Sequence, residues 1–517
     1  MDVLVVGGGI SGLVAARDLA QAGVAVTLVE AGPRLGGKIA TERIDGFVVE
    51  AGPDSFLATR PAAVELCREL GLRDRLIGTT EPRAVFVQHR GRLLPLPEGL
   101  ALVLPTRLRP FLTSPLFSPR EKLRMGLDLL LPRGRLDGDE SVGAVLRRRA
   151  GGALVERLAG PLVGGIYGTD VDELSLLAVM PQLREAERSH RSLLLAGLAA
   201  GRTLREAAKG HVNGTVASGP TGGSGRHGGA LEGSTAATNQ GPSRSTSMFL
   251  SLAGGMSELV DALRTALERA PQPVDVRTGT TVEVLEAAAG AYRAHLSDGA
   301  ALRAEAVVLA VPAWAAARIL GIALPAAVRA LRSIPFGSSL AVSLGFREDQ
   351  LTEPLRGHGY LVPPAEDHSI SACTWSSEKW TARAPAGFVL IRAFVRSPDS
   401  GLLAATDETL VGAVRADLER TMGVRGAPVL THVARWPDAM PRYTVGHLDR
   451  VQAVEAAMAA LPGIVVAGAS YRGVGLPDCV AQGRAAAARV LGRLGGGPRA
   501  GISRTGTESD GEVAPPG

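Results

Sequence analysis

The chain opens with apolar residues at strand spacing, followed by apolar residues at helical spacing. Residues 2–6 (DVLVV) form an apolar run of the length of a strand, and residues 11–22 repeat apolar side chains along one helical face. A second apolar run covers residues 24–29 and ends at Glu30. The pattern predicts a strand, a turn, a helix and a second strand, which together make a βαβ unit.

Glycines stand at G-x-G-x-x-G spacing between the first strand and the helix. They are Gly7, Gly9 and Gly12, and Glu30 follows 18 residues after the last of them. Gly7 permits a tight turn, Gly9 leaves room for a pyrophosphate at the helix N-terminus, and Gly12 lets the helix pack closely on the strand. A glycine turn of this kind also occurs without a ligand. Because both strands, the helix and a ribose-binding acid are in register, the unit predicts dinucleotide binding.

A glycine pair between two cations follows the acid. Arg34 and Lys38 flank Gly36 and Gly37, so that phosphates meet positive charge with little steric obstruction. An acid followed shortly by R-x-G-G is characteristic of flavin oxidases of the amine oxidase type rather than of nicotinamide dehydrogenases. This second pattern predicts that the dinucleotide is FAD.

The middle of the chain predicts a helical region and then a sheet. Residues 61–209 have mostly helical apolar spacing. Residues 280–285 and 306–311 are apolar runs that we expect to return to the nucleotide-binding domain as strands. Four later segments with alternating or apolar patterns and turn residues between them predict an antiparallel sheet: residues 338–346, 359–362, 370–375 and 388–395.

The chain closes by repeating its opening pattern. Residues 463–467 (GIVVA) predict a strand, residues 468–475 form a second glycine-rich turn, and Pro477 and Asp478 start an alanine-rich helix. We expect the positive end of this helix to face a flavin ring and to stabilise negative charge on its reduced form.

The expected fold class is α/β, with a Rossmann-like FAD-binding domain formed by both chain ends, an antiparallel-sheet substrate domain and a mostly helical domain. The predicted bounds are residues 1–60, 248–312 and 434–492 for the FAD-binding domain, 61–209 for the helical domain and 313–433 for the substrate domain. Residues 210–247 and the tail, residues 493–517, are dominated by small and polar residues, which predicts a disordered insertion and a disordered tail.

Length and charge narrow the class of protein. The 517 residues are enough for two or three domains. A formal net charge of +5 is small for this length and gives no case for nucleic-acid binding. The three cysteines, Cys67, Cys373 and Cys479, are far apart and match no metal or redox spacing, which suits reduced thiols in a cytoplasmic protein.

The sequence also bears on membranes. The N-terminus has no basic segment of a signal peptide, and no stretch reaches the roughly 18 apolar residues of a transmembrane helix. Residues 92–117 are proline-rich and apolar but contain Arg107 and Arg109. This segment fits a lipophilic entrance, a peripheral contact with a membrane surface, or a packed irregular connection.

Eight segments in order resemble motifs of the bacterial coproporphyrinogen/protoporphyrinogen oxidase family of flavoproteins. They read GGGISGL, GPDSFLATRP, DESVGAVLRRR, PLVGGIYGTDVDELSL, EAERSHRSL, SACTWSSEKW, RWPDAMPRYTVGH and GASYRGVGLPDC. The resemblance covers almost the whole chain except residues 211–246, and its last segments are far more specific than G-x-G-x-x-G. It implies an FAD-dependent, six-electron oxidation of a porphyrinogen by three O2, with three H2O2 formed, in haem biosynthesis.

The resemblance also implies which residues contact FAD. They are Gly7, Gly8, Gly9, Ile10, Ser11, Gly12, Glu30, Lys38, Gly52, Pro53, Asp54, Ser55, Val282, Trp436, Val474, Gly475 and Leu476. Lys38 stands where related oxidases often have arginine, and a single tryptophan after a strand, as at position 436, also suits a core. Candidate substrate residues are Arg83, as a propionate clamp, and Tyr167, Tyr360 and Tyr443; each of them also fits a structural role. No catalytic residue and no metal ligand is assigned.

Two activities within this family stay open. Coproporphyrinogen III carries four propionates and protoporphyrinogen IX two, and the arginine-rich middle region favours the former. Two other classes of protein are alternatives. An amine or carotenoid oxidase on the same scaffold would not be expected to contain the later segments, and a binding module without FAD would not be expected to contain the second glycine turn. Pathway logic adds the next enzyme of haem synthesis as an expected partner.

Overall fold

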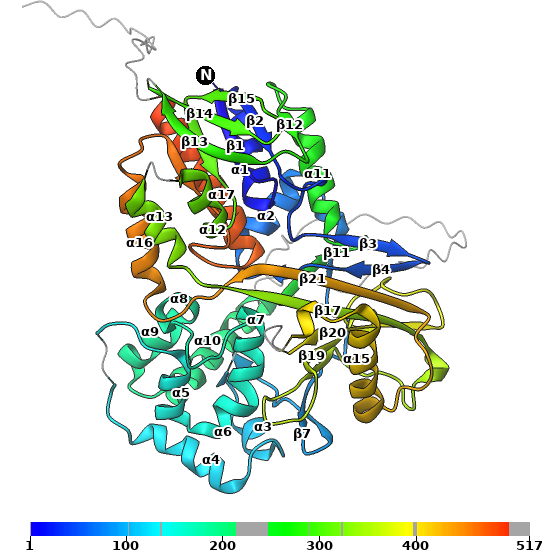
Figure 1. The fold of residues 1–517 in the computed structure, drawn as a ribbon. Helices are drawn as coiled ribbons and strands as arrows, with labels where there is room; N and C mark the ends of the chain where they lie inside the picture. The colour runs from blue at the N-terminus through cyan, green and yellow to red at the C-terminus, as the bar shows by residue number, and fades with distance from the viewer. Residues whose placement is uncertain are drawn as a thin grey trace, which may run out of the picture.

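A five-stranded parallel sheet assembled from both ends of the chain forms the upper part of the molecule (Figure 1). Its strand order is β12 (Asp275–Arg277), β2 (Ala25–Val29), β1 (Asp2–Val6), β16 (Ala306–Leu309) and β22 (Ile464–Val466). The predicted Rossmann-like arrangement is therefore confirmed. The computed structural model describes residues 2–101, 103–134, 137–213, 247–288, 290–321, 324–396 and 401–495.

Both faces of this sheet are buried, because successive side chains of its strands point to opposite sides. In β1, Val3 and Val5 lie in one core, and Leu4 and Val6 lie in the other. The first core also contains residues of α1 (Ile10–Gln21), α2 (Pro61–Glu69), α11 (Ser257–Glu268) and α17 (Leu476–Gly495). The second contains residues of α12 (Ala313–Leu320), α13 (Pro325–Arg332) and α16 (His447–Met458).

The strand expected at residues 280–285 forms, and its Val282 and Leu285 lie in the second core beside the parallel sheet. It is β13 (Val282–Ala288), which pairs antiparallel with β14 (Ala291–Leu296), and β14 pairs with β15 (Ala301–Ala304) in a separate three-stranded sheet. Only the second predicted strand, β16, joins the parallel sheet, beside β1. A nearby hairpin partner gives β13 a local antiparallel ladder, a competition that apolar spacing alone does not reveal.

A seven-stranded sheet forms the right-hand lower part of the molecule (Figure 1). Its order is β21 (Leu430–Pro441), β17 (Phe336–Arg347), β20 (Phe388–Val395), β19 (Ile370–Trp375), β18 (Gly359–Leu361), β7 (Val85–His89) and β8 (Arg92–Pro95). The pairing is antiparallel except between β18 and β7. Helix α15 (Asp407–Met422) contributes to the core on one face. The antiparallel sheet was predicted, but β7 and β8 come from the region predicted to be helical, so that prediction is wrong there.

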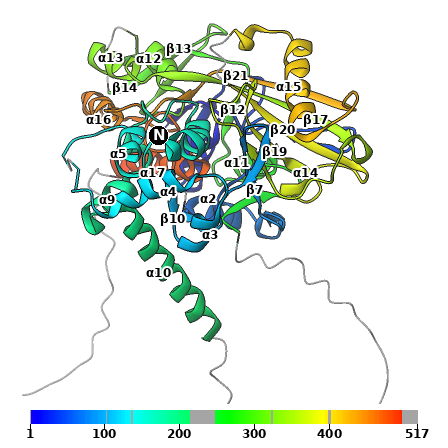
Figure 2. The same ribbon diagram turned by 90° about the horizontal axis from the view of Figure 1, so that it is seen from below.

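The helical part lies at the lower left of Figure 1. Its main helices are α3 (Leu108–Thr113), α4 (Pro119–Gly126), α5 (Val142–Ala150), α9 (Pro181–His190) and α10 (Leu193–Asn213), and α10 projects away from the body in Figure 2. At its centre the buried Arg149 guanidinium lies 2.6 Å from Glu187 and 3.4 Å from Asp128. The buried charges are therefore paired, as burial requires.

Shorter elements complete the described chain. They are β3 (Thr41–Ile44), β4 (Phe47–Glu50), β5 (Phe56–Leu57), β6 (Leu76–Gly78), β9 (Leu100–Ala101), β10 (Leu104–Pro105), β11 (Phe249–Leu252), α6 (Gly152–Leu154), a π-helical stretch Val155–Gly164, α7 (Gly165–Tyr167), α8 (Leu176–Val179) and α14 (Ser376–Lys379). Within the part of the chain that the structure describes, no helix combines the length and apolarity needed to cross a bilayer.

The predicted insertion and tail lie almost wholly outside the described residues. Residues 210–213 are helical and end α10, so the helix runs farther than predicted, and Ser247 precedes β11. The tail is described only as far as residue 495, where α17 ends. The domain bounds given above stay predictions.

Candidate functional site

The first glycine turn has the close packing and the open space that a dinucleotide needs. Gly7 has a φ of +103°, and a Cβ there would lie 2.6 Å from the Ala310 carbonyl oxygen. A Cβ on Gly12 would lie 1.9 Å from the Gly7 carbonyl oxygen, so α1 packs directly on the turn. At Gly9, which caps α1 without a side-chain hydrogen bond, a Cβ would meet no atom within 4 Å. The start of α1 therefore faces free space.

Glu30 is held at the edge of this space. Its Oε2 accepts a 2.6 Å hydrogen bond from the Gly8 amide, and its Oε1 accepts a 2.7 Å bond from the Gly32 amide. A carboxylate has about four acceptor positions, so two remain for ribose hydroxyls. The Thr280 amide donates to the Glu30 carbonyl oxygen at 3.1 Å, which brings the start of β13 and the predicted residue Val282 to the same end of the site.

The loop after Glu30 closes on the first turn. The Arg34 guanidinium donates to the carbonyl oxygens of Leu35, Gly37 and Ile39, and a Cβ on Gly37 would lie 3.2 Å from the Gly9 Cα. Burial lowers the pKa of the Lys38 ammonium, which lies near the Cys479 thiol. Among the described residues no carboxylate forms an ion pair with Lys38, so its charge is available to a phosphate.

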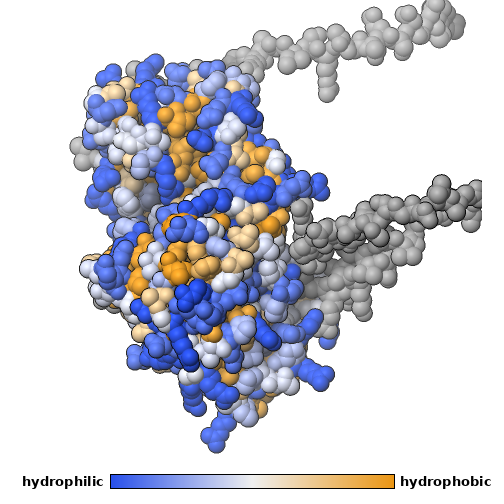
Figure 3. All heavy atoms as spheres, turned by 90° about the vertical axis from the view of Figure 1, so that its right-hand side faces the viewer, coloured by the Kyte–Doolittle hydropathy of each residue, from blue (hydrophilic) through white to orange (hydrophobic). Residues whose placement is uncertain are grey.

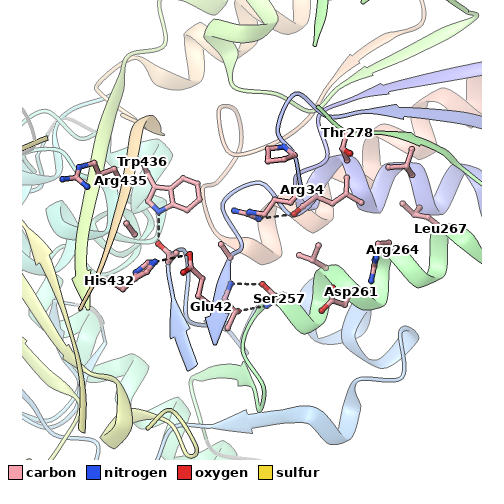
Figure 4. Close-up of a pocket in the computed structure, with 18 of the residues that line it drawn as sticks. Arg34, Glu42, Ser257, Asp261, Arg264, Leu267, Thr278, His432, Arg435 and Trp436 are labelled. Carbon is pink, nitrogen blue, oxygen red and sulfur yellow. Dashed lines mark hydrogen bonds and ion pairs between the residues drawn. The ribbon is translucent and has the colours of Figure 1, made fainter. Parts of the chain in front are cut away.

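The Ala51–Gly52 segment is held by two donors from the seven-stranded sheet. The buried Arg392 guanidinium donates to the Gly52 carbonyl oxygen at 2.7 Å and to the Ala51 carbonyl oxygen at 3.3 Å. The Trp436 indole N–H donates to the same Ala51 oxygen at 2.8 Å, as Figure 4 shows. On the other side, a Cβ on Gly52 would lie 1.7 Å from the Lys38 carbonyl oxygen. The segment is therefore fixed between the sheet and the Lys38 loop.

Asp54 accepts three hydrogen bonds from protein donors. Its Oδ2 lies 2.8 Å from the Lys379 ammonium and accepts a 3.0 Å bond from the Trp380 indole, while the Ser55 hydroxyl donates to Oδ1 at 2.7 Å. Burial by itself raises the pKa of Asp54, but the Lys379 charge and these hydrogen bonds hold it well below its usual value. The side chain thus joins the predicted cofactor loop to the segment that reads SSEKW.

The second glycine turn meets the first at the start of α17. The Ser11 hydroxyl donates to the Cys479 carbonyl oxygen at 2.8 Å, and a Cβ on Gly468 would lie 3.9 Å from the Ser11 Oγ. Gly473 has a φ of +108°, and a Cβ there would lie 2.5 Å from the Asp478 carboxylate. Val474, Gly475 and Leu476, all predicted to contact the cofactor, form the end of this turn and the first residue of α17.

The four candidate substrate residues separate in the structure. The rings of Tyr167 and Tyr443 lie 5.9 Å apart, and the Tyr443 hydroxyl bonds to the second glycine turn. Tyr360 pairs in register with Cys373 and lies in the core on the α15 side of the sheet, on the face opposite Arg392. Arg83 forms a 3.0 Å ion pair with Glu81 on a partly exposed loop. Only the two tyrosines of the first pair approach the predicted cofactor residues.

A cavity of about 930 Å³ borders the site (Figure 4). It lies between the loop that contains Arg34, helix α11 and strand β21, and it reaches the site at Ala51 and Trp436. On the face of the molecule shown in Figure 3, apolar patches alternate with hydrophilic side chains. The lining of the cavity includes Trp436 but neither glycine turn, so it lies beside the turns and meets the predicted cofactor residues at Trp436.

Residues 10–491 match the family described as flavin-containing amine oxidoreductases. The chain belongs to this family. Its cofactor is FAD, as the sequence predicted, and the open space at Gly9, the unfilled acceptors of Glu30 and the unpaired charge of Lys38 fit it. Because the amine oxidoreductases bind flavin, the two glycine turns and the Ala51–Ser55 segment are the residues that would hold it.

Relatives within and near this family extend over nearly the whole chain. A coproporphyrinogen III oxidase from Propionibacterium freudenreichii subsp. freudenreichii is 43% identical over 95% of this chain and 90% of its own. A protoporphyrinogen oxidase from Bos taurus is 31% identical over 95% of this chain and 98% of its own. A crystal structure of a protein from Exiguobacterium sp. 255-15 is 33% identical, with a TM-score of 0.77, covering 96% of this chain and 99% of that one.

Sequence reasoning missed three residues that organise the site. Arg392, Lys379 and Trp380 hold the Ala51–Asp54 segment from the sheet side. Lys379 and Trp380 lie within the SSEKW segment, which was singled out as a motif without a role for its residues. Arg392 lies in a strand that otherwise reads as apolar (FVLIRAFV), and a charge in such a run is a usable signal.

Proposed function

We propose that the chain oxidises coproporphyrinogen III to coproporphyrin III, with O2 as the electron acceptor. The observation that carries the proposal is the relative named coproporphyrinogen III oxidase, which is 43% identical over 95% of this chain. The contacts of the site support it, because segments from both chain ends and from the sheet converge on the predicted cofactor residues. The proposal places the reaction in the cytoplasm, within haem biosynthesis.

The reaction removes six electrons and six protons from the macrocycle. FAD, when bound, accepts a hydride from a bridging methylene carbon. Three turnovers consume three O2 and release three H2O2. Of the three protons that accompany the hydrides, two come from pyrrole nitrogens and one comes from the remaining methylene carbon, and they leave to solvent or substrate nitrogens; the proposal assigns no protein base. The role of this chain is to hold the cofactor through Glu30, Lys38 and the two glycine turns, and to keep the Ala51–Gly52 carbonyls in place through Arg392.

Oxidation of protoporphyrinogen IX is the alternative function. It is supported by a relative from Bos taurus that is named protoporphyrinogen oxidase and is 31% identical. Arg83 and Tyr167 are the proposed substrate contacts from the earlier set: Arg83 lies on a partly exposed loop, and Tyr167 lies beside the second glycine turn through Tyr443. Propionates pair well with a guanidinium, so a four-propionate substrate gains more from such cations.

Steady-state oxidation of the two porphyrinogens tests the proposal. The purified protein, saturated with FAD, is mixed aerobically with each porphyrinogen, and porphyrin fluorescence and H2O2 are followed together. We expect a higher kcat/KM for coproporphyrinogen III and three H2O2 per porphyrin. A clear preference for protoporphyrinogen IX would select the alternative, and a protein that binds FAD but oxidises neither would refute both.

A peripheral contact with an anionic membrane surface is part of the proposal. Leu112, Leu123 and Leu130 are 50%, 72% and 73% exposed on neighbouring segments of the helical part, and Arg109 and Arg120 are exposed beside them. Lys122 joins these segments by donating to the Leu112 carbonyl oxygen. Exposed leucines ringed by cations suit the surface of an anionic bilayer.

Sedimentation with vesicles containing phosphatidylglycerol tests this contact. The wild-type chain should pellet with the vesicles at low salt, and a Leu123→Ser/Leu130→Ser variant should stay in solution. A Val429→Ser variant changes an exposed apolar residue in the sheet part, 46% exposed, and should pellet like wild type. Wild-type protein that stays in solution at low salt would refute the contact. The next enzyme of haem synthesis is the proposed recipient of the porphyrin.

A further inference from the structure

We propose that Tyr443 and His447 are positioning residues that set the conformation of the second glycine turn, residues 468–475, against the flavin. Neither residue is assigned a contact with the substrate or the cofactor in this proposal. Both act through the backbone of the turn. The kinetic part of the inference rests on the proposed function, whereas the cofactor part rests only on membership of the flavin-containing family.

The Tyr443 hydroxyl spans the turn. It donates a 2.7 Å hydrogen bond to the Ala469 carbonyl oxygen and accepts a 2.9 Å bond from the Gly473 amide. The side chain is buried, with 1% of its surface exposed, so solvent does not replace these bonds. One hydroxyl thus fixes two backbone groups four residues apart, which a phenylalanine ring in the same place would leave unpaired.

His447 fixes a third backbone group between those two. Its Nε2 donates to the Tyr471 carbonyl oxygen at 2.8 Å, and its ring stacks on the Tyr443 ring at 3.7 Å with an interplanar angle of 17°. The ring is fully buried. Ala469, Tyr471 and Gly473 are therefore all held from one stacked pair, at alternate positions along the turn.

The turn needs such support because its own sequence is permissive. Gly468 and Gly473 have φ values of +122° and +108°, a region that glycine adopts readily. Other contacts lie at single points of the turn: the Ala313 amide donates to the Ser470 Oγ at 3.0 Å, the Arg472 guanidinium bonds to the Glu455 carboxylate, and the Gln482 amide donates to the Gly473 carbonyl oxygen at 3.4 Å. Without Tyr443 the turn would sample other conformations at the start of α17.

Tyr443 also joins this turn to the helical part of the molecule. The Ser175 amide donates to the Tyr443 carbonyl oxygen at 2.7 Å, and the Tyr167 ring lies 5.9 Å from the Tyr443 ring. The pair is thus placed at the junction of the two parts. The Val445 amide donates to the Glu173 carbonyl oxygen at 2.9 Å as well, so this whole segment joins the helical part, and the Tyr443 side chain extends that connection to the turn.

The test is Tyr443→Phe, with Tyr292→Phe as its matched control. Tyr292 is also buried, and its hydroxyl donates to the Pro462 carbonyl oxygen at 3.0 Å, away from both glycine turns. In Tyr443→Phe we expect the Kd for FAD to rise about tenfold, the flavin absorption bands to shift, and the midpoint potential of the bound flavin to fall, because the α17 N-terminus stabilises the reduced form less. Tyr292→Phe should lose comparable thermal stability with no change in Kd, spectrum or potential.

His447 supplies the second arm. His447→Gln keeps a donor for the Tyr471 carbonyl oxygen, so the bound flavin should retain its wild-type midpoint potential. His447→Leu removes that donor and should lower the midpoint potential, as Tyr443→Phe does. With porphyrinogen, Tyr443→Phe should lower kcat with KM little changed. A Tyr443→Phe protein with the wild-type FAD affinity and potential would overturn the inference. Because those two measurements use no porphyrinogen, they stand even if the proposed substrate is wrong.

Discussion

The hydroxyl of Ser11, in the first turn of α1, donates a 2.8 Å hydrogen bond to the carbonyl oxygen of Cys479, in the first turn of α17. These residues are 468 positions apart in the chain, and their contact brings the two helix N-termini together. Both termini present unpaired amides and positive dipole ends. In the proposed site, the two chain ends thus supply helix N-termini to both the pyrophosphate and the flavin ring.

Gly9→Leu should abolish FAD binding without unfolding the protein. A Cβ at Gly9 would meet no protein atom within 4 Å, so a larger side chain there would extend into the space left for the pyrophosphate. The variant should purify colourless and should melt at the temperature of the wild-type apoprotein. Gly412→Leu places the same side chain in open space on α15 and should stay yellow. Full flavin occupancy in Gly9→Leu would show that the site is misplaced.

Glu30→Gln should weaken FAD binding by about 10- to 100-fold, because the amide replaces one acceptor oxygen by a donor facing the Gly8 or Gly32 amide. Titration of the apoprotein with FAD, followed by flavin fluorescence, measures the change. Glu65→Gln, at an exposed position on α2, is the control and should bind as wild type. Equal affinities for both variants would remove Glu30 from the ribose site.

Lys379→Met should destabilise the protein by about 1–3 kcal/mol at pH 7, because it leaves the Asp54 carboxylate, whose side chain is only 22% exposed, without its cation. The folded pKa of Asp54 is depressed, so its pairing contributes stability above the usual aspartate pKa and is lost as pH falls through the folded value. In the variant that pKa rises, and the deficit should shrink as pH is lowered from 7 to 5. Urea unfolding at both pH values measures it.

The control for this change is Arg347→Met, which breaks an ion pair with Asp349 whose side chains are 55% and 72% exposed. Such exposed pairs contribute about 0–1 kcal/mol. A deficit in Lys379→Met that is equally small, or that grows as pH falls, would contradict the assignment of Lys379 as the partner of Asp54.

His447 should make the protein sensitive to mild acid. Burial lowers the pKa of His447 from its ordinary 6.5 to about 4. Between pH 4 and 6.5, His447 is therefore protonated in the unfolded chain but neutral in the folded chain. Stability therefore rises with pH across this window, and the group accounts for up to about 3 kcal/mol of the change. Urea unfolding of wild type and His447→Gln between pH 7 and 4 should show a shallower dependence in the variant. Parallel curves would mean that His447 titrates normally.

Local patterns predicted the strands and helices on either side of both glycine turns. The first glycine turn and the acid after it lie within the first thirty residues: Gly7, Gly9, Gly12 and Glu30. Their arrangement depends on turn geometry and on the packing of one helix on one strand, both of which neighbouring residues determine. The second glycine turn and the start of α17 were likewise visible, because positive φ and helix N-terminal chemistry favour particular residues. Membership of the flavin-containing family, and with it FAD, followed from these turns together with the later motifs.

Only the tertiary structure decided how these parts are held. The strands β7 and β8 joined the seven-stranded sheet through a parallel pairing of β7 with β18, a long-range contact that local spacing does not encode. The same folding turned Arg392 toward the Gly52 carbonyl and Tyr360 toward the opposite face, although both lie in apolar strands. The alternation of side chains along a strand places Arg392 and Tyr360 on opposite faces of the sheet. Which of these faces meets the cofactor depends on how the sheet packs against the rest of the chain.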